Sequence, residues 1–267
     1  MSTPPTADQI AAANAYEALF VAALFRQWAP KVAGTARIQA GQRVLDVACG
    51  TGVLARELLS RVGSTGQVVG LDANPGMLAV AAGGAPSVEW HQGIAESLPF
   101  PDASFDAVVS QFGMMFFTDA RQAVREMMRV LRPGGRLAVA VWNSLDENPA
   151  YGAAVALLER TAGRAAADAL RAPFVLGRRK DLETLFADAD VQAAIVETHQ
   201  GVADFPSIRI MVEADLRGWL PVMGISLPQD HIERILQDAE HALGAYRTAD
   251  NRMAFPVSAH IVSATKR

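Results

Sequence analysis

The stretch from Arg43 to Gly52, RVLDVACGTG, constrains the fold of this chain more than any other segment. Its first half is apolar and typical of a buried parallel strand, while Gly50 and Gly52 allow the backbone to turn tightly and approach a ligand. A helix is predicted from Thr51 to Val62, and the next apolar strand ends in Asp72. Two strands that each end in an acid, joined through glycines and a helix, predict a nucleoside-binding site.

The same residues also fit a dinucleotide-binding turn. Residues 50–55 match G-x-G-x-x-G/A, and Asp72 follows Gly52 by about twenty positions, where an acid would hold a ribose hydroxyl. Asp46 argues against a dinucleotide, because a carboxylate at the strand end would face the pyrophosphate at close range. That carboxylate suits a ligand with an ammonium group and no phosphate. The sequence therefore favours a cationic nucleoside.

Four more segments accompany this motif. In chain order, the five are VLDVACGTG at 44–52, VVGLDANPGML at 68–78, GIAESLPFPDASFDAVVSQFG at 93–113, REMMRVL at 125–131 and RPGGRLAVAVW at 132–142. In this order and spacing they resemble the class I S-adenosylmethionine-dependent methyltransferases, and among them the ubiquinone and menaquinone biosynthesis type. The resemblance implies that S-adenosyl-L-methionine is the cofactor and that a small molecule is the methyl acceptor.

Composition limits the partners and the location. The chain has 267 residues, 51% hydrophobic and 19% charged, which suits one large domain with an added lid. Its net charge is −4 and it has no basic block, so nucleic acid is not expected as a partner. The N-terminus lacks a signal-like pattern, and the apolar run Leu19–Phe25 is too short to span a bilayer. We expect a cytoplasmic chain with no membrane span, and a homodimer stays an open option.

Strands and helices alternate along the first half of the chain, which predicts an α/β fold with helices on both faces of a parallel sheet. The predicted strands are Arg43–Ala48, Gln67–Asp72, Val88–Gly93, Phe105–Gln111 and Gly135–Trp142, and the predicted helices are Thr51–Val62, Pro75–Ala82 and Asp119–Leu131. Further on, Gln192–Gln200 and Met253–Thr265 are candidate strands, with a helix at Lys180–Ala187. Together they predict a Rossmann-like, seven-stranded, mostly parallel sheet.

The chain holds more residues after Trp142 than this sheet needs. We interpret residues 148–177 and 206–246 as helical lid insertions. The expected organisation is a single methyltransferase domain over residues 1–267. Within it, residues 41–142 form the cofactor-binding core and residues 1–40 form a helical segment over the cofactor.

The predicted cofactor site centres on the ends of the first two strands. Asp72 would accept hydrogen bonds from both ribose hydroxyls, which one carboxylate can do bidentately, with Ala73 beside it. Asp46 either orients the first loop, or meets the ammonium group through water, or has a purely structural role. The loop residues expected along the methionine and ribose are Gly50, Thr51 and Gly52.

The adenine side departs from the family's pattern. By resemblance Met77 would lie against the adenine, although a core methionine explains it nearly as well. Ile94 and Ala95 stand where the family usually has an acid or amide for the adenine amino group. Base selection is therefore expected to rest on backbone groups, with Glu96 as a substitute acceptor. By resemblance Gln111 touches the methionine portion.

Apolar segments are the candidates for closing the site. An N-terminal helix from Ala7 to Trp28 carries an apolar stripe at four-residue spacing, made of Tyr16, Phe20, Leu24 and Trp28. The helix either packs on the domain or, by resemblance, closes over the cofactor with Tyr16 inward. Phe112, Met115 and Phe116 form either a wall between cofactor and acceptor or ordinary core. The lid residues expected at an apolar acceptor pocket, or simply in the lid core, are Phe174, Ile210, Met211, Trp219, Leu220, Pro221 and Met223.

Methyl transfer itself asks little of protein side chains, because the sulfonium is an activated leaving group and positioning supplies most of the acceleration. An oxygen acceptor would need a base, whereas an electron-rich ring carbon needs less help. We assign no catalytic residue among the five histidines, interpret Cys49 as a filler of the tight turn, and predict no metal site. The sequence thus predicts C- or O-methylation of a small apolar or aromatic molecule. The alternatives are a non-methylating protein of the same fold, cyclase-like or regulatory, and a nicotinamide-dependent oxidoreductase.

Overall fold

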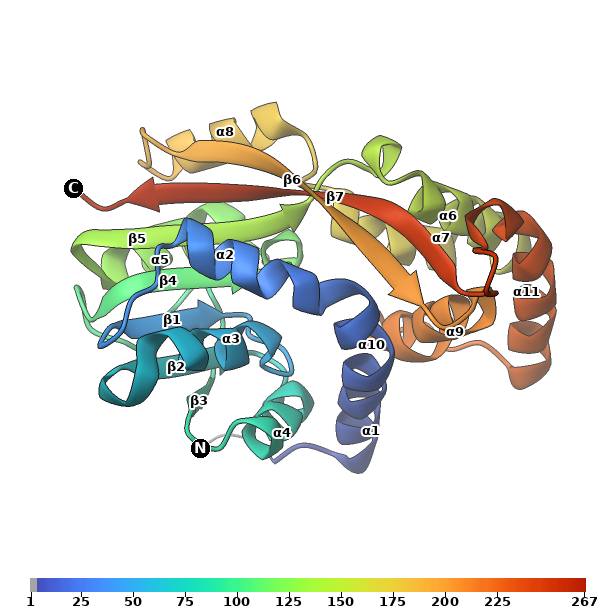
Figure 1. Ribbon diagram of the computed structural model, residues 1–267, viewed down its shortest axis with the longest axis horizontal. Coiled ribbons are helices and arrows are strands. Elements are labelled where there is room, and N and C mark those ends of the chain that lie inside the picture. The colour runs from blue at the N-terminus through green and yellow to red at the C-terminus, as the bar shows by residue number, and fades with distance from the viewer. Residues whose placement is uncertain (1–3) are drawn as a thin grey trace.

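A seven-stranded sheet runs through the molecule, as the sequence predicts (Figure 1). The computed structural model describes residues 4–267. The strand order is β3-β2-β1-β4-β5-β7-β6, and neighbouring strands are parallel except where β7 pairs with β5 and β6. The fold is therefore the predicted Rossmann-like, mostly parallel α/β fold, with β7 as its antiparallel strand.

Most elements lie within a few residues of their predicted bounds. The strands are β1 (Arg43–Val47), β2 (Gln67–Asp72), β3 (Glu89–Gln92), β4 (Phe105–Gln111), β5 (Leu131–Trp142), β6 (Ile195–Phe205) and β7 (Met253–Thr265). The α-helices are α1 (Ala7–Tyr16), α2 (Ala29–Thr35), α3 (Val53–Val62), α4 (Pro75–Gly84), α5 (Ala120–Val130), α6 (Pro149–Thr161), α7 (Arg164–Arg171), α8 (Arg179–Asp188), α9 (Ile208–Glu213), α10 (Leu220–Val222) and α11 (Gln229–Ala242). The 3-10 segments are η2 (Arg26–Trp28), η3 (Gly63–Thr65), η4 (Met114–Phe116), η5 (Leu145–Glu147), η6 (Ala172–Phe174) and η8 (Gly244–Tyr246), and the π-helical segments are η1 (Glu17–Phe25) and η7 (Ala214–Trp219).

Two elements differ from their predictions in ways that bear on the site. β6 begins at Ile195 and continues to Phe205, beyond the predicted end at Gln200, because it stays paired with β7 along that whole length. The predicted helix from Ala7 to Trp28 is not uniformly α-helical. α1 passes into the π-helical η1 and then the 3-10 segment η2, so the side chains of η1 are rotated relative to a regular helix.

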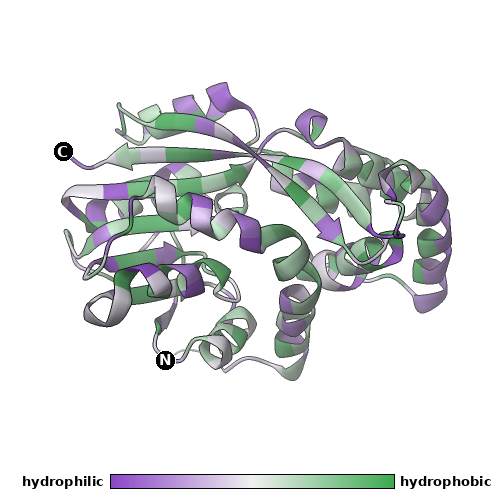
Figure 2. Cartoon of the chain, viewed as in Figure 1, coloured by the Kyte–Doolittle hydropathy of each residue, from purple (hydrophilic) through white to green (hydrophobic). Residues whose placement is uncertain are grey.

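Helices cover both faces of the sheet. α2 and α3 pack on one face, and α5 and α8 pack together on the other (Figure 1). Hydrophobic residues, green in Figure 2, run along the strands, and most hydrophilic residues lie on helices and loops. Val44, Leu45 and Val47 of β1 are fully buried, as expected for a strand covered on both sides. This double cover leaves the ends of the strands as the place for a ligand site.

The segments from 148–177 and 206–246 form one helical layer beyond the carboxyl ends of the parallel strands (Figure 1). α6 packs against α7 and α11, and α11 packs against α9. Trp219 Nε1 donates to the carbonyl oxygen of Ala169 at 2.9 Å, which joins the two segments directly. The far halves of β6 and β7 extend into this layer and connect it to the sheet.

A buried polar cluster fixes the point where the chain leaves β5 for this layer. The side-chain nitrogen of Asn148 donates to the carbonyl oxygens of Asn143 and Ser258, at 3.2 and 3.3 Å. The Asn148 side-chain oxygen accepts from the backbone N–H of Ser258 at 2.9 Å. All three residues are buried, where an unpaired polar group would be costly. The cluster therefore sets the start of α6 against β7.

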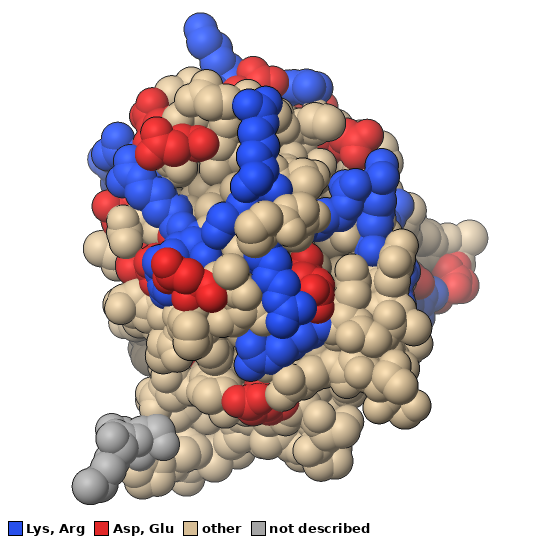
Figure 3. All heavy atoms as spheres, turned by 90° about the vertical axis from the view of Figure 1, so that its left-hand side faces the viewer, with Lys and Arg blue, Asp and Glu red and all other residues tan. Residues whose placement is uncertain are grey.

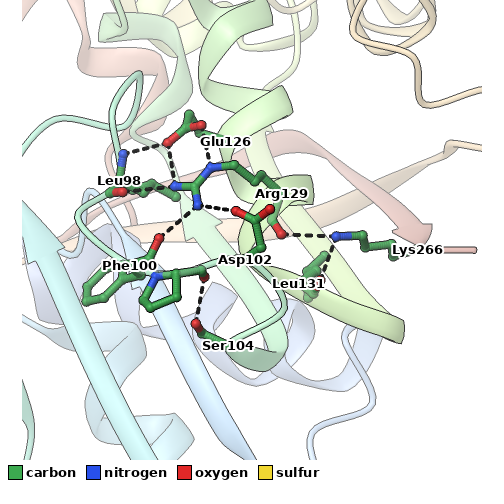
Figure 4. A network of polar contacts seen from close by, with 9 residues as sticks. Leu98, Phe100, Asp102, Ser104, Glu126, Arg129, Leu131 and Lys266 are labelled. Atoms are coloured by element: carbon green, nitrogen blue, oxygen red, sulfur yellow. Dashed lines mark hydrogen bonds and ion pairs between the residues drawn. The ribbon is translucent and has the colours of Figure 1, made fainter.

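A second network holds the loop between β3 and β4 against α5 (Figure 4). Arg129 donates to the carbonyl oxygens of Leu98 and Phe100 at 3.0 and 2.8 Å, and it pairs with Glu126 and Asp102. Glu126 in turn accepts from the backbone N–H of Leu98 at 2.8 Å. The hydrogen bonds from Arg129 hold the pKa of Glu126 below its usual range. The network anchors a loop whose first residues lie at the ligand cavity described below.

The opposite face of the molecule, at the amino ends of the parallel strands, carries many charges (Figure 3). Lysine and arginine side chains stand beside acidic ones there rather than forming one continuous basic surface. The pairs Arg132–Asp106 and Arg129–Asp102 belong to this end of the sheet, with N···O distances of 2.6 and 2.8 Å. Among the helices of residues 4–267, none combines the length and apolar character needed to cross a bilayer.

Gly52 combines two reasons for glycine, a left-handed backbone and a close neighbour. Its φ is +86°, and an added Cβ would lie 2.8 Å from Trp90 Cη2. Gly70 also lies close to the Trp90 ring, since a Cβ there would come within 2.3 Å of Cζ3. We expect Gly52→Ala to lower the free energy of unfolding by about 1–3 kcal/mol, because left-handed backbone and a close contact combine.

The matched control is Gly83→Ala. Gly83 lies in α4, and an added Cβ would meet nothing within 4 Å. That variant is expected to be as stable as the wild type or more stable by about 0.5 kcal/mol, because alanine favours helix. Urea unfolding of the three proteins provides the measurement. Equal stability changes in the two variants would refute this account of Gly52.

Candidate cofactor and acceptor site

A cavity of about 450 Å³ lies at the carboxyl ends of β1, β2 and β4. The predicted cofactor residues that line it are Tyr16, Asp46, Gly50, Thr51, Asp72, Ala73, Met77, Ile94, Ala95 and Gln111. Gly52 is the predicted residue that does not line it, since its α-carbon faces Trp90 instead. Gly52 therefore acts on the site indirectly, by allowing the turn. These predicted residues come from five separate segments of the sequence and meet around one space of ligand size.

Asp72 joins the two loops that form the floor of this cavity. Its Oδ2 accepts from the backbone N–H of Gly50 at 2.8 Å, and its Oδ1 accepts from that of Asn74 at 2.8 Å. Asn74 then caps α4 by accepting from the backbone N–H of Gly76 at 2.8 Å. A carboxylate has about four lone-pair positions, so each Asp72 oxygen keeps the capacity for a ligand hydroxyl.

Asp46 is a second acid on the same cavity and is 1% exposed. Neither of its carboxylate oxygens has a hydrogen-bond partner among the described residues. Burial, and then the charge of Asp72, raises the pKa of Asp46 well above its usual range, and burial also raises that of Asp72. A buried and a half-buried acid on one cavity, without a basic partner among the described residues, favour a cationic ligand, which would offset the cost of removing them from water.

The backbone is strained where β1 and β4 end at the cavity. Ala48 and Phe112 have φ angles of +56°, a left-handed conformation that side chains other than glycine's disfavour. Gly113 follows Phe112, and an added Cβ at Gly113 would be 2.4 Å from the Ala48 Cβ. The two loops therefore approach each other closely. Both Ala48 and Phe112 line the cavity, so the strain occurs where a ligand would lie.

Cavity-facing polar groups extend along these loops. Thr51 is buried and its Oγ1 has no partner among the described residues. Gln111 donates through its side-chain nitrogen to the carbonyl oxygen of Phe25 at 3.1 Å, whereas its Oε1 is unpaired. Gln111 thus ties the N-terminal segment to the end of β4 and keeps one oxygen available to a ligand. Buried groups that lack a protein partner are candidates for contacts with a ligand.

The adenine side of the predicted site is apolar, and its acid, Glu96, is hydrogen-bonded to the loop before α5. Ile94 lines the cavity with 53% of its surface exposed, and Ala95 is buried beside it. Glu96 Oε1 accepts from the backbone N–H groups of Thr118 and Asp119, at 2.7 and 3.3 Å. That carboxylate therefore holds the loop before α5. Its contribution as an acceptor for adenine stays a prediction.

The N-terminal segment forms one wall of the cavity through its π-helical turn. Tyr16 stacks with Phe25 at a ring separation of 5.3 Å, and Phe20 is 5.7 Å from Tyr16. The regular spacing in the sequence suggested Leu24 and Trp28 as the continuation of this stripe, and Phe25 was not expected. The π-helical turn adds a residue and brings Phe25 into line. Gln27 fixes the segment by two hydrogen bonds with the backbone of Val202 in β6, at 2.7 and 2.8 Å.

A smaller chamber of about 60 Å³ adjoins the main cavity on the side of the helical layer. Its lining is Tyr16, Phe20, Leu24, Phe25, Phe112, Phe116, Trp142, Tyr151, Leu170, Pro173, Phe174, Asp215 and Trp219. Phe112 and Trp142 stack face to face, with ring centroids 3.9 Å apart and planes at 6°. Five residues are shared with the main cavity: Tyr16, Phe25, Phe112, Phe116 and Trp219. The two spaces therefore share one aromatic wall.

The structure separates the predicted lid residues into two groups. Phe174 lines the smaller chamber, Trp219 lines both spaces and Met223 lines the main cavity alone. The lid residues outside both linings are Ile210, Met211, Leu220 and Pro221. Sequence reasoning missed Trp142, Tyr151 and Asp215. Trp142 was treated only as a strand end, and the other two stand in helical segments without any motif, where only the tertiary fold brings them inward.

The histidines and the cysteine do not form a nucleophilic or basic centre. No histidine is among the described residues that line either space. His260 is held by Thr198 Oγ1 and the carbonyl oxygen of Gly177, and burial lowers its pKa. Cys49 lines the cavity, but burial raises its pKa, so the thiol stays protonated. These contacts agree with the structural interpretation of both residue types.

Residues 12–160 match the model of the ubiE/COQ5 methyltransferase family. A relative from Hahella chejuensis, named ubiquinone/menaquinone biosynthesis C-methyltransferase UbiE, is 45% identical over 122 residues. That alignment covers 43% of this chain and 49% of the relative. The chain thus spans about half the length of the curated relatives it matches. The family match, residues 12–160, includes every residue that lines the main cavity except Trp219, Val222 and Met223.

Solved structures extend the likeness in fold to most of the chain. The YcgJ protein of Bacillus subtilis has a TM-score of 0.58 at 22% identity, over 90% of this chain and 98% of that one. The phosphoethanolamine N-methyltransferase 2 of Haemonchus contortus, solved with S-adenosylhomocysteine, has a TM-score of 0.60 at 18% identity. The latter alignment covers 96% of this chain and 57% of the other. At these identities the comparisons establish the fold.

The unpaired Asp46 carboxylate leads to a prediction about pH. Burial holds its pKa above the usual value of about 4, and a cationic ligand favours the ionised form, so binding releases protons. We expect S-adenosylmethionine to bind more tightly as the pH rises through the raised pKa, and Asp46→Asn to show a shallower dependence. Calorimetric titrations from about pH 5 to about pH 9 measure both slopes.

The control for this titration is Asp188→Asn. Asp188 is a half-exposed acid of α8 that does not line the cavity, so its removal is expected to leave the slope unchanged. Ionisation of the ligand's own amino group contributes equally to the pH dependence of binding in the wild type and in both variants. If Asp46→Asn and the wild type showed the same slope, Asp46 would not be linked to the cofactor.

Proposed function

The chain belongs to the ubiE/COQ5 methyltransferase family, and on that basis we propose that it transfers the methyl group of S-adenosylmethionine to a small apolar or aromatic acceptor. The cofactor of such an enzyme is S-adenosylmethionine, whose sulfonium and ammonium groups are both cationic. The observation that carries the proposal is a pair of acids, the buried Asp46 and the half-buried Asp72, on a cavity of ligand size. A cationic nucleoside satisfies that pair, whereas a dinucleotide pyrophosphate would be repelled by it.

The groups that line the cavity suggest which residues contact the ribose, the methionine portion and the base of the cofactor. Asp72 binds the ribose hydroxyls, because it closes the second strand and has free lone pairs on both oxygens. Asp46, Thr51 and Gln111 Oε1 lie on the methionine side. Met77, Ala73, Ile94 and Ala95 contact the base, which is then selected by apolar contact and backbone groups. Tyr16 closes the cavity from the N-terminal segment.

The chemistry needs alignment more than side-chain participation. The methyl carbon is attacked in line with the bond to sulfur, and sulfur leaves as a neutral thioether. Positioning of the two reactants can supply several kcal/mol of the barrier, about 7–11 kcal/mol in the best oriented systems. The aromatic wall shared by the two spaces would hold an acceptor against the methyl group and exclude water. The segments 148–177 and 206–246 would act as its cover within a single domain, together with the described part of the N-terminal segment 1–40, which starts at residue 4.

The acceptor class follows from the second space. Its wall is almost entirely aromatic and aliphatic, with apolar contacts from Trp142, Phe174 and Trp219. A flat ring suits the part of this wall that the two spaces share, where it would stack or make edge contacts with Phe112, Phe116 and Trp219. We therefore propose methylation at a ring carbon or at an oxygen attached to the ring. The names of the curated relatives, which specify C-methylation in quinone biosynthesis, support the ring carbon.

Calorimetry and mass analysis test the proposal. The wild type is expected to bind S-adenosylmethionine and not nicotinamide dinucleotides, and to give acceptors a mass gain of one methylene group in a panel of hydroquinones and phenols. Binding of S-adenosylmethionine without any mass gain in that panel would point to a non-methylating protein of the same fold. Preference for the dinucleotide would contradict the proposal outright.

Substitution of Asp72, the residue proposed to bind the ribose, provides a quantitative check. Asp72→Ala is expected to weaken S-adenosylmethionine binding by about 1.5–3 kcal/mol, the range for hydrogen bonds to a charged group. The control is Asp119→Ala, which removes an acid that accepts from the backbone N–H of Gln122 and lies outside the cavity. The Asp119→Ala variant should have a lower free energy of unfolding but the same affinity for S-adenosylmethionine as the wild type. Unchanged affinity in a folded Asp72→Ala variant would remove Asp72 from the site.

A further inference from the structure

A lone acid, Asp215, lies on the wall of the aromatic chamber. It belongs to the π-helical segment η7 and is 3% exposed. The chamber of about 60 Å³ has room for about two water molecules. Apart from the hydroxyls of Tyr16 and Tyr151, Asp215 is the sole titratable group among the described residues that line it. A small space with one acid in an apolar wall is suited to a single polar group of a ligand.

Protein groups do not neutralise Asp215. Its neighbours on the chain, Glu213 and Arg217, pair with each other at an N···O distance of 3.8 Å. Glu213 also pairs with Arg209, and Arg217 also pairs with Glu233. Among the described residues no hydrogen bond or ion pair holds the Asp215 carboxyl group, and burial alone raises its pKa to about 8. A buried acid without a partner destabilises a fold, and perturbed acids of this kind are frequent at functional sites.

The elements packed against η7 bring few titratable groups toward Asp215. α1 contributes Tyr16, and α10 contributes none. Glu17 of η1 is paired with Arg56 at 2.8 Å, and Arg209 of α9 is paired with Glu233 at 2.8 Å on the surface. From α6 comes Tyr151, whose pKa is raised by burial and then by the charge of Asp215. The environment of Asp215 therefore holds two phenol groups and no cation.

The chamber that holds Asp215 also adjoins the cavity of the methyl donor. The chamber shares Tyr16, Phe25, Phe112, Phe116 and Trp219 with the cofactor cavity. Phe112 directly follows β4, at the strand end where the structure bends into a left-handed turn. A ring placed against this shared wall would have one edge toward the cofactor cavity and its other edge toward Asp215.

We propose that Asp215 binds the hydroxyl group of the aromatic acceptor and takes its proton as the methyl group is transferred. This inference rests on the proposed methyltransferase function and adds to it a catalytic base. The polar head of the acceptor occupies the chamber, and its ring lies on the wall that the two spaces share.

The step balances in protons and electrons. As the acceptor O–H bond breaks, the proton passes to the Asp215 carboxylate. For an oxygen acceptor, the freed electron pair forms the O–CH3 bond while the C–S bond breaks and its pair stays on sulfur. For a ring carbon, the new C–C bond forms and the ring becomes a neutral dienone. The ring C–H proton is then released to water, and Asp215 returns its proton to the oxygen, which restores the aromatic hydroxyl.

A neutral hydroxyl fits this position better than an ammonium group. The sulfonium of the cofactor already places a positive charge in the adjoining cavity, and a second cation nearby would be repelled in an apolar environment. An amine must also lose its proton before it can attack. A base whose pKa lies close to neutral pH is well matched to a phenolic hydroxyl, whose pKa is about 10.

The first experiment measures recognition of the hydroxyl. The protein saturated with S-adenosylhomocysteine is titrated calorimetrically with 2-naphthol and with naphthalene, which lacks only the hydroxyl. The wild type is expected to prefer 2-naphthol by about tenfold or more. The apolar variant Asp215→Leu should lose that preference, Asp215→Asn should keep most of it, and Glu213→Gln on the surface of the same layer should match the wild type.

The second experiment measures proton transfer, using the acceptor that gains the most mass in the hydroquinone and phenol panel. The rate of the wild type should rise with pH to a plateau above about pH 8, because only the ionised Asp215 accepts a proton. Asp215→Asn should be slower by about a hundredfold or more without that rise, with an unchanged affinity for S-adenosylmethionine. Glu213→Gln should keep the profile of the wild type.

Folding is checked through the thermal midpoints. The folded state of the wild type holds the Asp215 proton up to about pH 8, whereas the unfolded chain loses it near pH 4, so ionisation destabilises the fold in between. Asp215→Asn is therefore expected to melt at a higher temperature than the wild type at alkaline pH, and the difference should shrink in acid. A midpoint lower than that of the wild type at every pH would contradict the burial of an unpaired acid.

The outcomes separate this inference from the proposed function. Absence of S-adenosylmethionine binding would overturn the function itself. Cofactor binding with equal affinity for 2-naphthol and naphthalene, or an Asp215→Leu variant with the full preference, would overturn only the role of Asp215. Selective methylation of amines, with the same rate in Asp215→Asn, would also overturn it.

Discussion

The contact between Asp72 and the backbone of two loops holds the cofactor cavity together. One carboxylate accepts from the N–H of Gly50 after β1 and from that of Asn74 after β2, both at 2.8 Å. Because these strands are adjacent and parallel, their ends lie side by side, and an acid at the second can bind the turn after the first. The placement of Asp46, Thr51 and α4 around the cavity depends on this link.

The same arrangement explains why the cavity selects a cation. Asp46 is buried and Asp72 is half-buried, and the charge of Asp72 adds to burial in raising the pKa of Asp46. The protein supplies backbone N–H groups to Asp72 and no partner to Asp46 among the described residues. A positively charged ligand is the most direct way to balance such a pair. The arrangement is unfavourable for the empty protein, as expected where a site is formed for its ligand.

The first half of the chain was largely predictable because its signals are local. Strand hydrophobicity, the glycine turn and acids at strand ends are fixed by short-range backbone geometry, and β2 and β4 have their predicted bounds. The glycine pattern did not distinguish Gly50, which lines the cavity, from Gly52, which lies against Trp90. That distinction depends on a tryptophan from β3, a contact that spacing does not encode.

The remaining part of the site could not be predicted because it is made by long-range packing. The π-helical turn of η1 rotates Phe25 toward Tyr16, which a regular helical period does not anticipate. Tyr151 and Asp215 come from segments more than sixty positions apart, and both reach the chamber only because the two segments form one helical layer. The pairing of β6 and β7 beyond the sheet, and the Asn148 cluster, set the position of that layer.

A crystal structure of the protein with S-adenosylhomocysteine would show how the two acids hold the ligand. We expect both ribose hydroxyls on the Asp72 carboxylate and the ligand's amino group on the side of Asp46, joined to it directly or through water. The sulfur should face the wall formed by Phe112 and Phe116. A ligand that leaves Asp72 and Asp46 without contact, or that lies outside the cavity, would contradict these roles.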